Sequence, residues 1–529
     1  MKNYRKLRNV AVSLVLGSTA VQLNAMGLQN RWVPDILQPG AEEYLPDYSY
    51  AGYHNGEKPL PRLKPTVRVT DFGARADDGL DDTDAIKKAI AQAASLEGSQ
   101  VVGFPKGRFI VSDILFLEQS GLVLQGVGSG EDGTVLYFPK PLAEMPQPPE
   151  IKQLVVYLEK NNKRMGDEFF SPYSWTGGLI WAHEANLDPQ QVAEVTGGTR
   201  GQHTITVKDS TNVKPGMTLR VLWFNRDGPE GSLLQHMYMS SHPGCGSRLY
   251  ENPDEPIIKQ PVQVLAVNGK TITIKEPLLH DLKPEWTPLL ERFAPIQEVG
   301  IEQLRIEFPP AKYRGHHLEA GYNAIYMTGV RNSWVRDVVV VHGDSGFISG
   351  DISLITVQDI CIEGRGGHYT LHLSGYGVLV RDFVCTATAL HNPSVNTGCA
   401  CGVYTHGKIA SPILDQHSGG NHQNLFDDLE LSGVSSNLFE NSGAKYWMPA
   451  AGAYNTFWNL SVKNRLDTHD KATLGGLGAR AWHGRLIGIH GDKEINLDYD
   501  PSAYIEGTNR KDLAVPSLYE YQLRKRLDK

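Results

Sequence analysis

The chain has 529 residues and a formal net charge of −8. This length is enough for one large elongated domain or for two to three ordinary ones. The negative charge and the lack of a basic block argue against a nucleic-acid partner, because such partners are met by clustered Lys and Arg. No stretch approaches the roughly 20 apolar residues of a transmembrane helix, so we expect no membrane span.

The first 25 residues have the pattern of a secretory signal peptide. Basic residues in the first eight positions precede an apolar stretch from Val10 to Val21, and the small residue Ala25 closes the segment. This pattern predicts cleavage after Ala25 and a mature protein that is secreted or periplasmic. Residues 26–66, rich in Pro, Tyr and Trp, are expected to wrap the outside of the fold.

Residues 67–140 predict a strand, an acidic turn, a helix and then short strands. Asp82 or Thr83 is expected to cap the helix, and Ile86, Ile90 and Ala93 form one apolar face. Short strands are expected at residues 101–104, 109–111 and 122–125.

Residues 141–295 contain alternating strands joined by glycine turns such as Asn268-Gly269. They predict a small β-rich insertion. Within it lies the irregular stretch 225–256, which is long enough to form a lid or a wall of a binding site.

A six-residue motif recurs between residues 296 and 495. Its form is apolar–x–(Asp, Asn or Gln)–apolar–x–apolar, with steps of 34, 22, 23, 46 and 31 residues between copies. A strand that returns every 22 to 23 residues, without intervening helices, predicts a β-helix solenoid, and 46 is twice 23. The longer steps imply longer loops, which usually build the binding face. The copies begin at Ile301, Val335, Val357, Val380, Phe426 and Phe457.

The acidic residues inside this motif are interpreted as turn or ladder residues rather than as catalytic groups. They are Asp337, Asp359 and Asp382, each in the third position of a copy. The charged tail, residues 496–529, is expected to be peripheral.

The N-terminal pattern resembles a known superfamily. Residues 71–74 (DFGA), 78–79 (DG) and 81–83 (DDT), followed by the amphipathic helix and a Pro-x-Gly turn, resemble the start of the pectate-lyase-like right-handed parallel β-helix proteins. The resemblance implies an all-β fold, a right-handed parallel β-helix solenoid with an N-terminal capping helix, to which the strand pattern of residues 141–295 adds the inserted β-rich domain. It does not fix the reaction, because the superfamily includes lyases, hydrolases, epimerases, fructotransferases and phage tailspikes.

The five cysteines do not predict a metal site. Cys361 and Cys385 alternate with apolar neighbours and are interpreted as small buried hydrophobes. Cys399 and Cys401 are one residue apart, fewer than the two to four of a zinc knuckle. No cofactor or metal is expected to be required. Calcium stays possible, since some β-helix lyases use it to bind the uronate, although the acidic turn at residues 77–84 is more simply a helix start.

Histidines cluster in the predicted coils, where seven of the eighteen lie between residues 342 and 422. Coils of a β-helix stack about 4.8 Å apart. His368, His391 and His417, separated by 23 and 26 residues, can therefore form a column along a groove. A ladder of hydrogen-bonded polar residues without a catalytic role is the alternative interpretation. The residues expected to flank the column are Arg365, Asp415 and His422.

An exported β-helix with a histidine-rich groove suits cleavage of an acidic, uronate-containing polysaccharide or oligosaccharide by β-elimination. This reaction needs a group that neutralises the uronate carboxylate, a base for the proton on the neighbouring carbon, and an acid for the leaving oxygen. Asp415 is expected to orient His417 or His391. The candidates are Arg365 or Lys445 as neutraliser, His368 or His391 as base, His417 or Tyr446 as acid, and Lys445, His422, Asp344, His342 and Trp447 as substrate-binding residues.

Two other functions remain open. A glycoside hydrolase would need two carboxylates about 5–10 Å apart, and Asp344 with Asp351, or Asp415 with Asp427 or Asp428, are candidate pairs. A non-catalytic carbohydrate-binding β-helix would show aromatic residues without convergent titratable groups, and the histidine column argues against it. The oligomeric state is not predicted.

Overall fold

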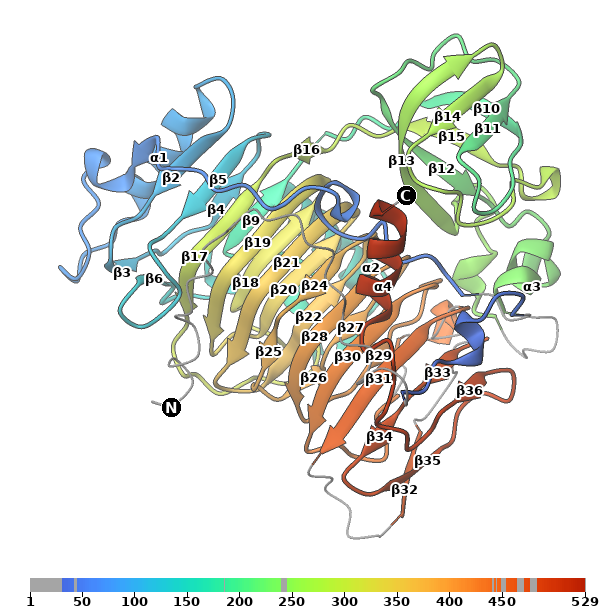
Figure 1. Cartoon of the computed structure of the whole chain (residues 1–529). Coiled ribbons are helices and arrows are strands. Elements are labelled where there is room, and N and C mark those ends of the chain that lie inside the picture. The colour runs from blue at the N-terminus through green and yellow to red at the C-terminus, as the bar shows by residue number, and fades with distance from the viewer. Residues whose placement is uncertain are drawn as a thin grey trace, which may run out of the picture.

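The structure is a computed structural model that describes residues 31–41, 45–184, 186–238, 245–439, 442–443, 445–448, 453–463, 471–475 and 483–528. The predicted signal segment, residues 1–25, lies outside them. Parallel strands stack along one axis into a β-helix (Figure 1), which confirms the predicted fold class. None of the described helices is long and apolar enough to cross a membrane.

The longer wall of the β-helix is one parallel sheet that runs from the first coils to the last. Its middle strands β19 and β21 pair in register along most of their length. In chain order its strands are β1 (Val67–Arg68), β2 (Gln100–Gly103), β3 (Gly107–Ile110), β5 (Leu122–Gln125), β6 (Thr134–Tyr137), β16 (Ile296–Gln297), β17 (Gly300–Glu307), β19 (Val330–Val341), β21 (Ile352–Glu363), β23 (Gly375–Tyr376), β24 (Leu379–Arg381), β25 (Val384–Cys385), β28 (Val403–Ala410), β30 (Leu425–Ser432), β31 (Thr456–Lys463), β33 (Arg485–Ile487), β34 (His490–Gly491) and β36 (Tyr504–Glu506).

A second parallel sheet forms the opposite wall and carries the histidines discussed below. Its strands are β4 (Leu115–Leu117), β9 (Ile180–His183), β18 (Asn323–Thr328), β20 (Ser345–Gly350), β22 (Gly367–Leu373), β26 (Ala389–His391), β27 (Ser394–Val395) and β29 (Asp415–Gln416). A separate two-stranded sheet of β32 (Lys471–Leu474) and β35 (Glu494–Leu497) lies near the last coils.

The recurring motif occupies the longer wall with one copy per coil. Val357 pairs with Val380, and the step of 46 residues contains one further copy, because Tyr404 pairs with both Val380 and Phe426. The third residue of each copy has a left-handed backbone, with φ near +54° at Asp382 and +53° at His406 of the additional copy. Asp and Asn tolerate this conformation better than most residues. The repeated acidic residues therefore bend the strands, as predicted.

The interior of the coils is filled by side chains that align from one coil to the next. The rings of Tyr404, Phe426 and Phe457 stack with centroids 5.5 Å and 5.1 Å apart. Cys385 is fully buried and Cys361 partly buried, and both are free thiols, as expected of small hydrophobes in strands. Buried apolar side chains from the first coils to the last belong to one cluster, so the core is continuous along the solenoid.

Helix α1 (Thr83–Ala94) closes the N-terminal end of the stack with Ile86, Ile90 and Ala93 buried, as predicted. Asp82 occupies the position before the helix, but its carboxylate does not cap it. Asp82 instead accepts hydrogen bonds from the backbone N–H groups of Arg75 and Ile110. The acidic turn therefore ties the cap to the first coil.

The predicted insertion is a closed antiparallel barrel, which stands at the upper right of Figure 1. It is smaller than residues 141–295, because β9 inside that range pairs with β4 and β18 of the second wall. The barrel strands are β10 (Gln191–Gly197), β11 (Thr204–Val207), β12 (Thr218–Trp223), β13 (Ile258–Asn268), β14 (Thr271–Ile274) and β15 (Leu289–Arg292). The remaining elements of this region are α2 (Pro149–Lys160), the hairpin of β7 (Arg164–Met165) and β8 (Glu168–Phe169), and α3 (Ser232–Tyr238).

A buried ion pair ties the barrel to the coils. Glu276, two residues after β14, lies 2.6 Å from the guanidinium of Arg331 on β19, and both side chains are nearly inaccessible to solvent. The backbone N–H of Gln263 and the side-chain amide of Asn55 also donate to Glu276. Barrel, solenoid and N-terminal segment therefore meet at one carboxylate.

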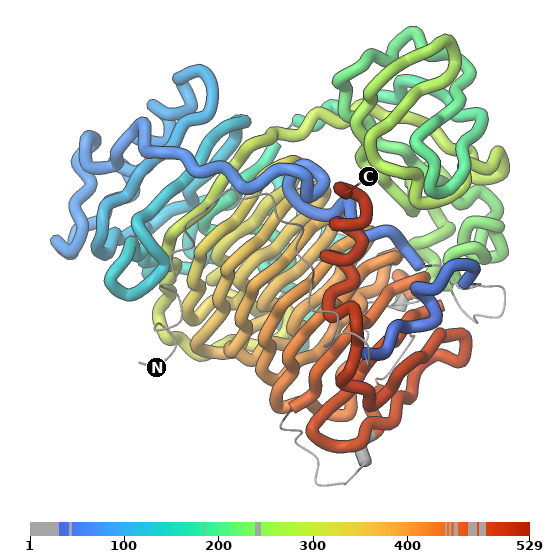
Figure 2. The backbone as a smooth tube through the Cα atoms, viewed as in Figure 1, coloured from blue at the N-terminus to red at the C-terminus, as the bar shows by residue number. Residues whose placement is uncertain are grey.

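The N-terminal segment and helix α4 (Leu518–Leu527) lie together on the outside of the longer wall (Figure 2). Tyr48 and Tyr519 are buried there in one apolar cluster. Asp427 of β30 holds the start of α4, since it accepts hydrogen bonds from the Ser517 hydroxyl and the Leu518 backbone N–H. The last coil extends beyond residue 495, because β36 pairs with β33.

His406 makes the docking of α4 dependent on pH. Its Nδ1 lies 2.8 Å from Asp428 and its Nε2 lies 3.1 Å from Glu520 of α4. The hydrogen bond with Asp428 raises the pKa of His406 to about 9, although burial opposes the shift. A raised folded-state pKa gives stability that is fully present below the unfolded value of about 6.5 and is lost as the pH rises through about 9.

We expect wild-type protein to lose about 1–2 kcal/mol of this contribution between slightly acid and alkaline pH, after allowance for solvent screening. The variant His406→Gln should lack this loss. Urea unfolding of both proteins across the pH range measures the difference. Parallel pH profiles for the two proteins would show that His406 is not the titrating group.

Candidate histidine site

The three histidines of the predicted column lie side by side on the second wall. His368 is on β22, His391 ends β26, and His417 follows β29. Ring centroids are 5.1 Å apart between His368 and His391 and 5.3 Å apart between His391 and His417. His368 and His391 are buried, while the side chain of His417 keeps 22% of its surface exposed.

Two further histidines join the column from the long turn between β17 and β18. His316 is exposed, and its ring centroid lies 4.9 Å from that of His368. His317 stacks on His316 at 3.7 Å and on Phe170 at 4.2 Å. Sequence reasoning missed both, although they lie in the 34-residue step that was expected to form a long loop.

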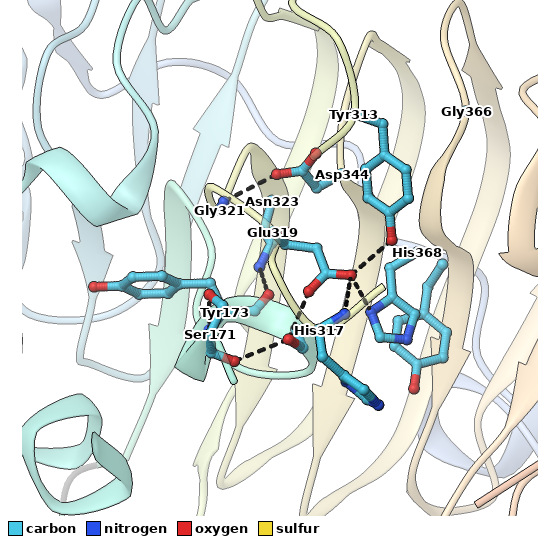
Figure 3. Close-up of polar contacts among 12 residues, drawn as sticks. Ser171, Tyr173, Tyr313, His317, Glu319, Gly321, Asn323, Asp344, Gly366 and His368 are labelled. Carbon is cyan, nitrogen blue, oxygen red and sulfur yellow. Dashed lines mark hydrogen bonds and ion pairs between the residues drawn. The ribbon is translucent and has the colours of Figure 1, made fainter. Parts of the chain in front are cut away.

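A buried carboxylate, Glu319, stands behind His368 (Figure 3). Its oxygens accept hydrogen bonds from the hydroxyls of Ser174 and Tyr313, each at 2.6 Å, and His368 Nδ1 lies 2.9 Å away. The backbone N–H of His317 donates to it as well. Burial alone would raise the pKa of Glu319, but these groups hold it at about 2.

A second buried carboxylate, Asp415, stands behind the other two rings. Its Oδ2 lies 3.2 Å from the Nδ1 atoms of both His391 and His417. The hydroxyls of Ser442 and Ser394 donate to it at 2.6 Å and 2.7 Å. Although burial opposes ionisation, the two histidines hold the pKa of Asp415 well below its usual range.

The ring nitrogens that face away from these carboxylates have no partner among the described residues. Nε2 of His368 and Nε2 of His391 are both buried and make no hydrogen bond there. Burial lowers the pKa of His368 to about 3, so its imidazole is neutral. Two groups, His316 with His368 and His391, and His391 with Asp415 and His417, bring one potential metal-ligand atom per residue within 4.8 Å of one another.

Arg365, Asp344 and His342 lie together in neighbouring turns. The Arg365 guanidinium lies 2.6 Å from Asp344, which also accepts the backbone N–H groups of Gly321 and Tyr322. The Nδ1 of His342 accepts the backbone N–H of Arg365 at 3.1 Å. Asp344 is thus satisfied within the protein. Arg365 also donates to the carbonyl of Gly366 at 2.9 Å, and its buried Nε has no partner among the described residues.

His422 belongs to a second histidine cluster, which it forms with His280 and His236. Its ring centroid is 5.0 Å from that of His280, whose Nδ1 is 3.0 Å from His236 Nε2. Burial lowers the pKa of His422 to about 4. His422 therefore packs the barrel against the coils instead of flanking the column.

The aromatic candidates come from the short turn Lys445–Trp447. The Lys163 ammonium lies 4.5 Å over the ring of Tyr446, and Arg248 lies 5.4 Å from that of Trp447. Trp447 and Arg248 line a cavity of about 480 Å³ that also includes Gly419, two residues after His417. The side chain of Lys445 lies outside the described part of the structure.

The carboxylate pairs considered for a hydrolase do not converge. Asp344 precedes and Asp351 follows the extended strand β20 (Ser345–Gly350), so the two lie at its opposite ends, and each is paired with an arginine: Asp344 with Arg365, and Asp351 with Arg220 at 2.7 Å. Asp427 and Asp428 are on β30 of the longer wall, whereas Asp415 is on the second wall. The carboxylates nearest the column, Glu319 and Asp415, have no exposed side-chain surface.

Comparisons with known proteins agree with this fold. Residues 66–137 match a family model described as rhamnogalacturonase A/epimerase, pectate lyase-like, and residues 388–529 match a domain of unknown function, DUF4955. No curated protein sequence matches the chain significantly.

Several solved structures match the chain at low identity and low TM-score. A tailspike of Pseudomonas phage phi297 is 11% identical with a TM-score of 0.40, over 84% of this chain and 76% of the tailspike. The A-module of a mannuronan C-5 epimerase from Azotobacter vinelandii is 12% identical with a TM-score of 0.32, over 83% and 96%. A DFA-IIIase from Arthrobacter chlorophenolicus is 11% identical with a TM-score of 0.38, over 84% and 95%.

Likenesses at this level carry no information about the reaction. The family model, however, covers the residues that resemble the superfamily in sequence, and the coils are those of a β-helix. The chain is therefore a parallel β-helix protein whose residues 66–137 match a pectate-lyase-like family model.

Proposed function

We propose that this protein is a secreted or periplasmic lyase that cleaves a uronate-containing polysaccharide by β-elimination. The observation that carries the proposal is the column of His368, His391 and His417 with its carboxylates buried behind the rings. Imidazoles, not carboxylates, face a bound sugar in this arrangement. Proton transfer by imidazole suits elimination, whereas glycoside hydrolysis requires two carboxylates that flank the bond.

His417, predicted from the sequence as the acid, is instead the residue that we propose as the base that accepts the proton. Its Nδ1 faces Asp415 and Ser442, and this contact leaves Nε2 with its lone pair for the substrate. The base takes the proton from the carbon next to the carboxylate. The electrons of that C–H bond form the new double bond, the bond to the glycosidic oxygen breaks, and a second group protonates the leaving oxygen.

The surroundings of the column suit an acidic sugar chain. The cavity beside Gly419 is lined by Arg248 and Lys259 together with the aromatic ring of Trp447, although the carboxylates of Glu255 and Asp351 line it as well and Glu255 lies 3.3 Å from Arg248. Cationic side chains attract uronates, and aromatic rings stack on sugar faces. Arg365 is the candidate neutraliser nearest the column in sequence, although it would have to share its guanidinium with Asp344.

The test is the ultraviolet absorbance of the conjugated double bond during incubation with alginate, pectate, glucuronan, ulvan and glycosaminoglycans. We expect a rise with at least one substrate and its loss in folded His417→Ala protein. The variant His406→Gln, altered on the opposite wall, should keep the activity. New reducing ends without absorbance would show hydrolysis and reject the lyase, and neither signal with any substrate would reject it as well.

A further inference from the structure

We infer that His316, His368 and His391 form a binding site for one divalent transition-metal ion such as Zn²⁺. One ring nitrogen from each residue lies within 4.8 Å of the other two. The site comes from two places in the chain, since His316 is in the turn before β18 while His368 and His391 are on adjacent strands. Nothing in the proposed elimination requires this site, so the two inferences stand separately.

The buried nitrogens provide the first independent support. Nε2 of His368 and Nε2 of His391 have no hydrogen-bond partner among the described residues, although these side chains are at least nine-tenths buried. A buried polar atom without a partner costs free energy and needs a physical reason. A bound cation would satisfy both nitrogens at once.

The carboxylates behind the rings provide the second line of support for the metal site. Glu319 lies 2.9 Å from Nδ1 of His368, and Asp415 lies 3.2 Å from Nδ1 of His391. Histidine ligands of metals almost always direct the other ring nitrogen at a carboxylate, carbonyl or water, which fixes the ring and increases its basicity. Both buried rings of the site have this arrangement.

The turn that carries His316 provides the third line of support for the metal site. The following residue, His317, has a left-handed φ of 63°, an uncommon conformation for a residue other than glycine. Stacking of the His317 ring on Phe170 at 4.2 Å holds this turn against the wall. His316 is thereby directed toward His368, with ring centroids 4.9 Å apart.

The donor set selects the class of ion. Ca²⁺ takes six to eight oxygen ligands, whereas imidazole suits Zn²⁺, Cu²⁺, Ni²⁺ and Fe²⁺. Bonds of about 2.0–2.1 Å to a tetrahedral ion place its nitrogens roughly 3.4 Å apart, and the exposed His316 can close this gap. Three histidines would leave a fourth position on the solvent side, as in catalytic zinc sites.

The use of the ion, unlike the site, rests on the proposed function. Arg365 is held by Asp344 at 2.6 Å. A cation beside the column would therefore be the better partner for a uronate carboxylate, which could occupy its open position. His417, which is not part of this group of three, would remain free to act as the base.

Titration calorimetry of untagged, chelator-treated protein with Zn²⁺ tests the site without any substrate. We expect one ion per chain, and at least about a 100-fold weaker affinity in His368→Ala, by analogy with the loss seen when groups around metal ligands are removed. His316→Ala should weaken binding at least about 10-fold, and because His316 is exposed this variant does not depend on a core substitution. Visible absorption of the Co²⁺-loaded protein should show the bands of a four-coordinate ion.

The matched control is His236→Ala in the second histidine cluster, where His236 and His280 already bond to each other at 3.0 Å. It should bind Zn²⁺ as wild type does. Absence of stoichiometric uptake by wild type, or unchanged affinity in both His316→Ala and His368→Ala, would overturn the site. If the protein binds Zn²⁺ but produces no rise in ultraviolet absorbance with any uronate polysaccharide, the metal site stands and the elimination reaction is rejected. If the rise in absorbance persists after complete removal of metal, the ion does not bind the uronate carboxylate during the reaction.

Discussion

Replacement of Asp415 by Asn is expected to lower kcat/KM on the uronate substrate by at least about 100-fold, with most of the loss in kcat. Asp415 accepts from the Nδ1 atoms of His391 and His417, both at 3.2 Å. An amide can present an N–H in place of one of these acceptor oxygens and so favours the wrong tautomer of His417. Steady-state kinetics followed by the ultraviolet absorbance of the product measure the effect.

Asp382→Asn is the matched control for this variant. Asp382 is on the opposite wall in a left-handed conformation with φ of 54°, which asparagine also tolerates. The kcat/KM of Asp382→Asn should equal that of wild type. Circular dichroism should show the same fold for both variants. Near wild-type kcat in folded Asp415→Asn protein would mean that the carboxylate does not orient the base.

Replacement of Glu276 by Ala is expected to destabilise the protein by about 3–5 kcal/mol, because it leaves the Arg331 charge buried without its partner. The Arg331 side chain is only 2% exposed and that of Glu276 is fully buried. The same change removes the acceptor for Asn55 and for the backbone of Gln263. Urea unfolding, with the slope compared between variants, measures the loss.

Two comparisons separate the buried charge from general effects of truncation. Glu194→Ala removes a carboxylate that is 61% exposed and paired with Lys208, and it should cost less than about 1 kcal/mol. The double variant Glu276→Leu/Arg331→Met removes both charges and should recover part of the stability lost in Glu276→Ala. Equal losses in Glu276→Ala and Glu194→Ala would contradict the role assigned to the ion pair.

The repeat of the strand motif along the coils was predictable because its physical cause is local. Each strand copy needs apolar residues that point inward and a residue that tolerates a left-handed bend, and Asp337, Asp359 and Asp382 supply the bend. The closeness of His391 to His368 follows from the same repeat, although the in-register partner of His391 is Tyr369, the neighbour of His368. Residue spacing therefore predicts that the two histidines are near each other, but not how their side chains align.

The rest of the site depends on loops that have no period. His316 and Glu319 reach the column only because the long turn before β18 folds back over the wall, and Ser442 arrives from another long turn. His422 was misplaced for a related reason. The barrel packs His280 against it, with ring centroids 5.0 Å apart, and a contact between an inserted domain and a coil leaves no spacing signal.

The position of the barrel also affects how the chain can fold. Gln125 and Glu302, hydrogen-bonded neighbours in the longer wall, are 177 residues apart. Joining such distant segments costs loop-closure entropy and slows folding. In the folded barrel, however, Gln191 at the start of β10 pairs with Glu291 near the end of β15. If the barrel folds first, the two ends of the insertion are already adjacent. The later coils can then pair with the first ones at an entropic cost close to that of a short connecting loop.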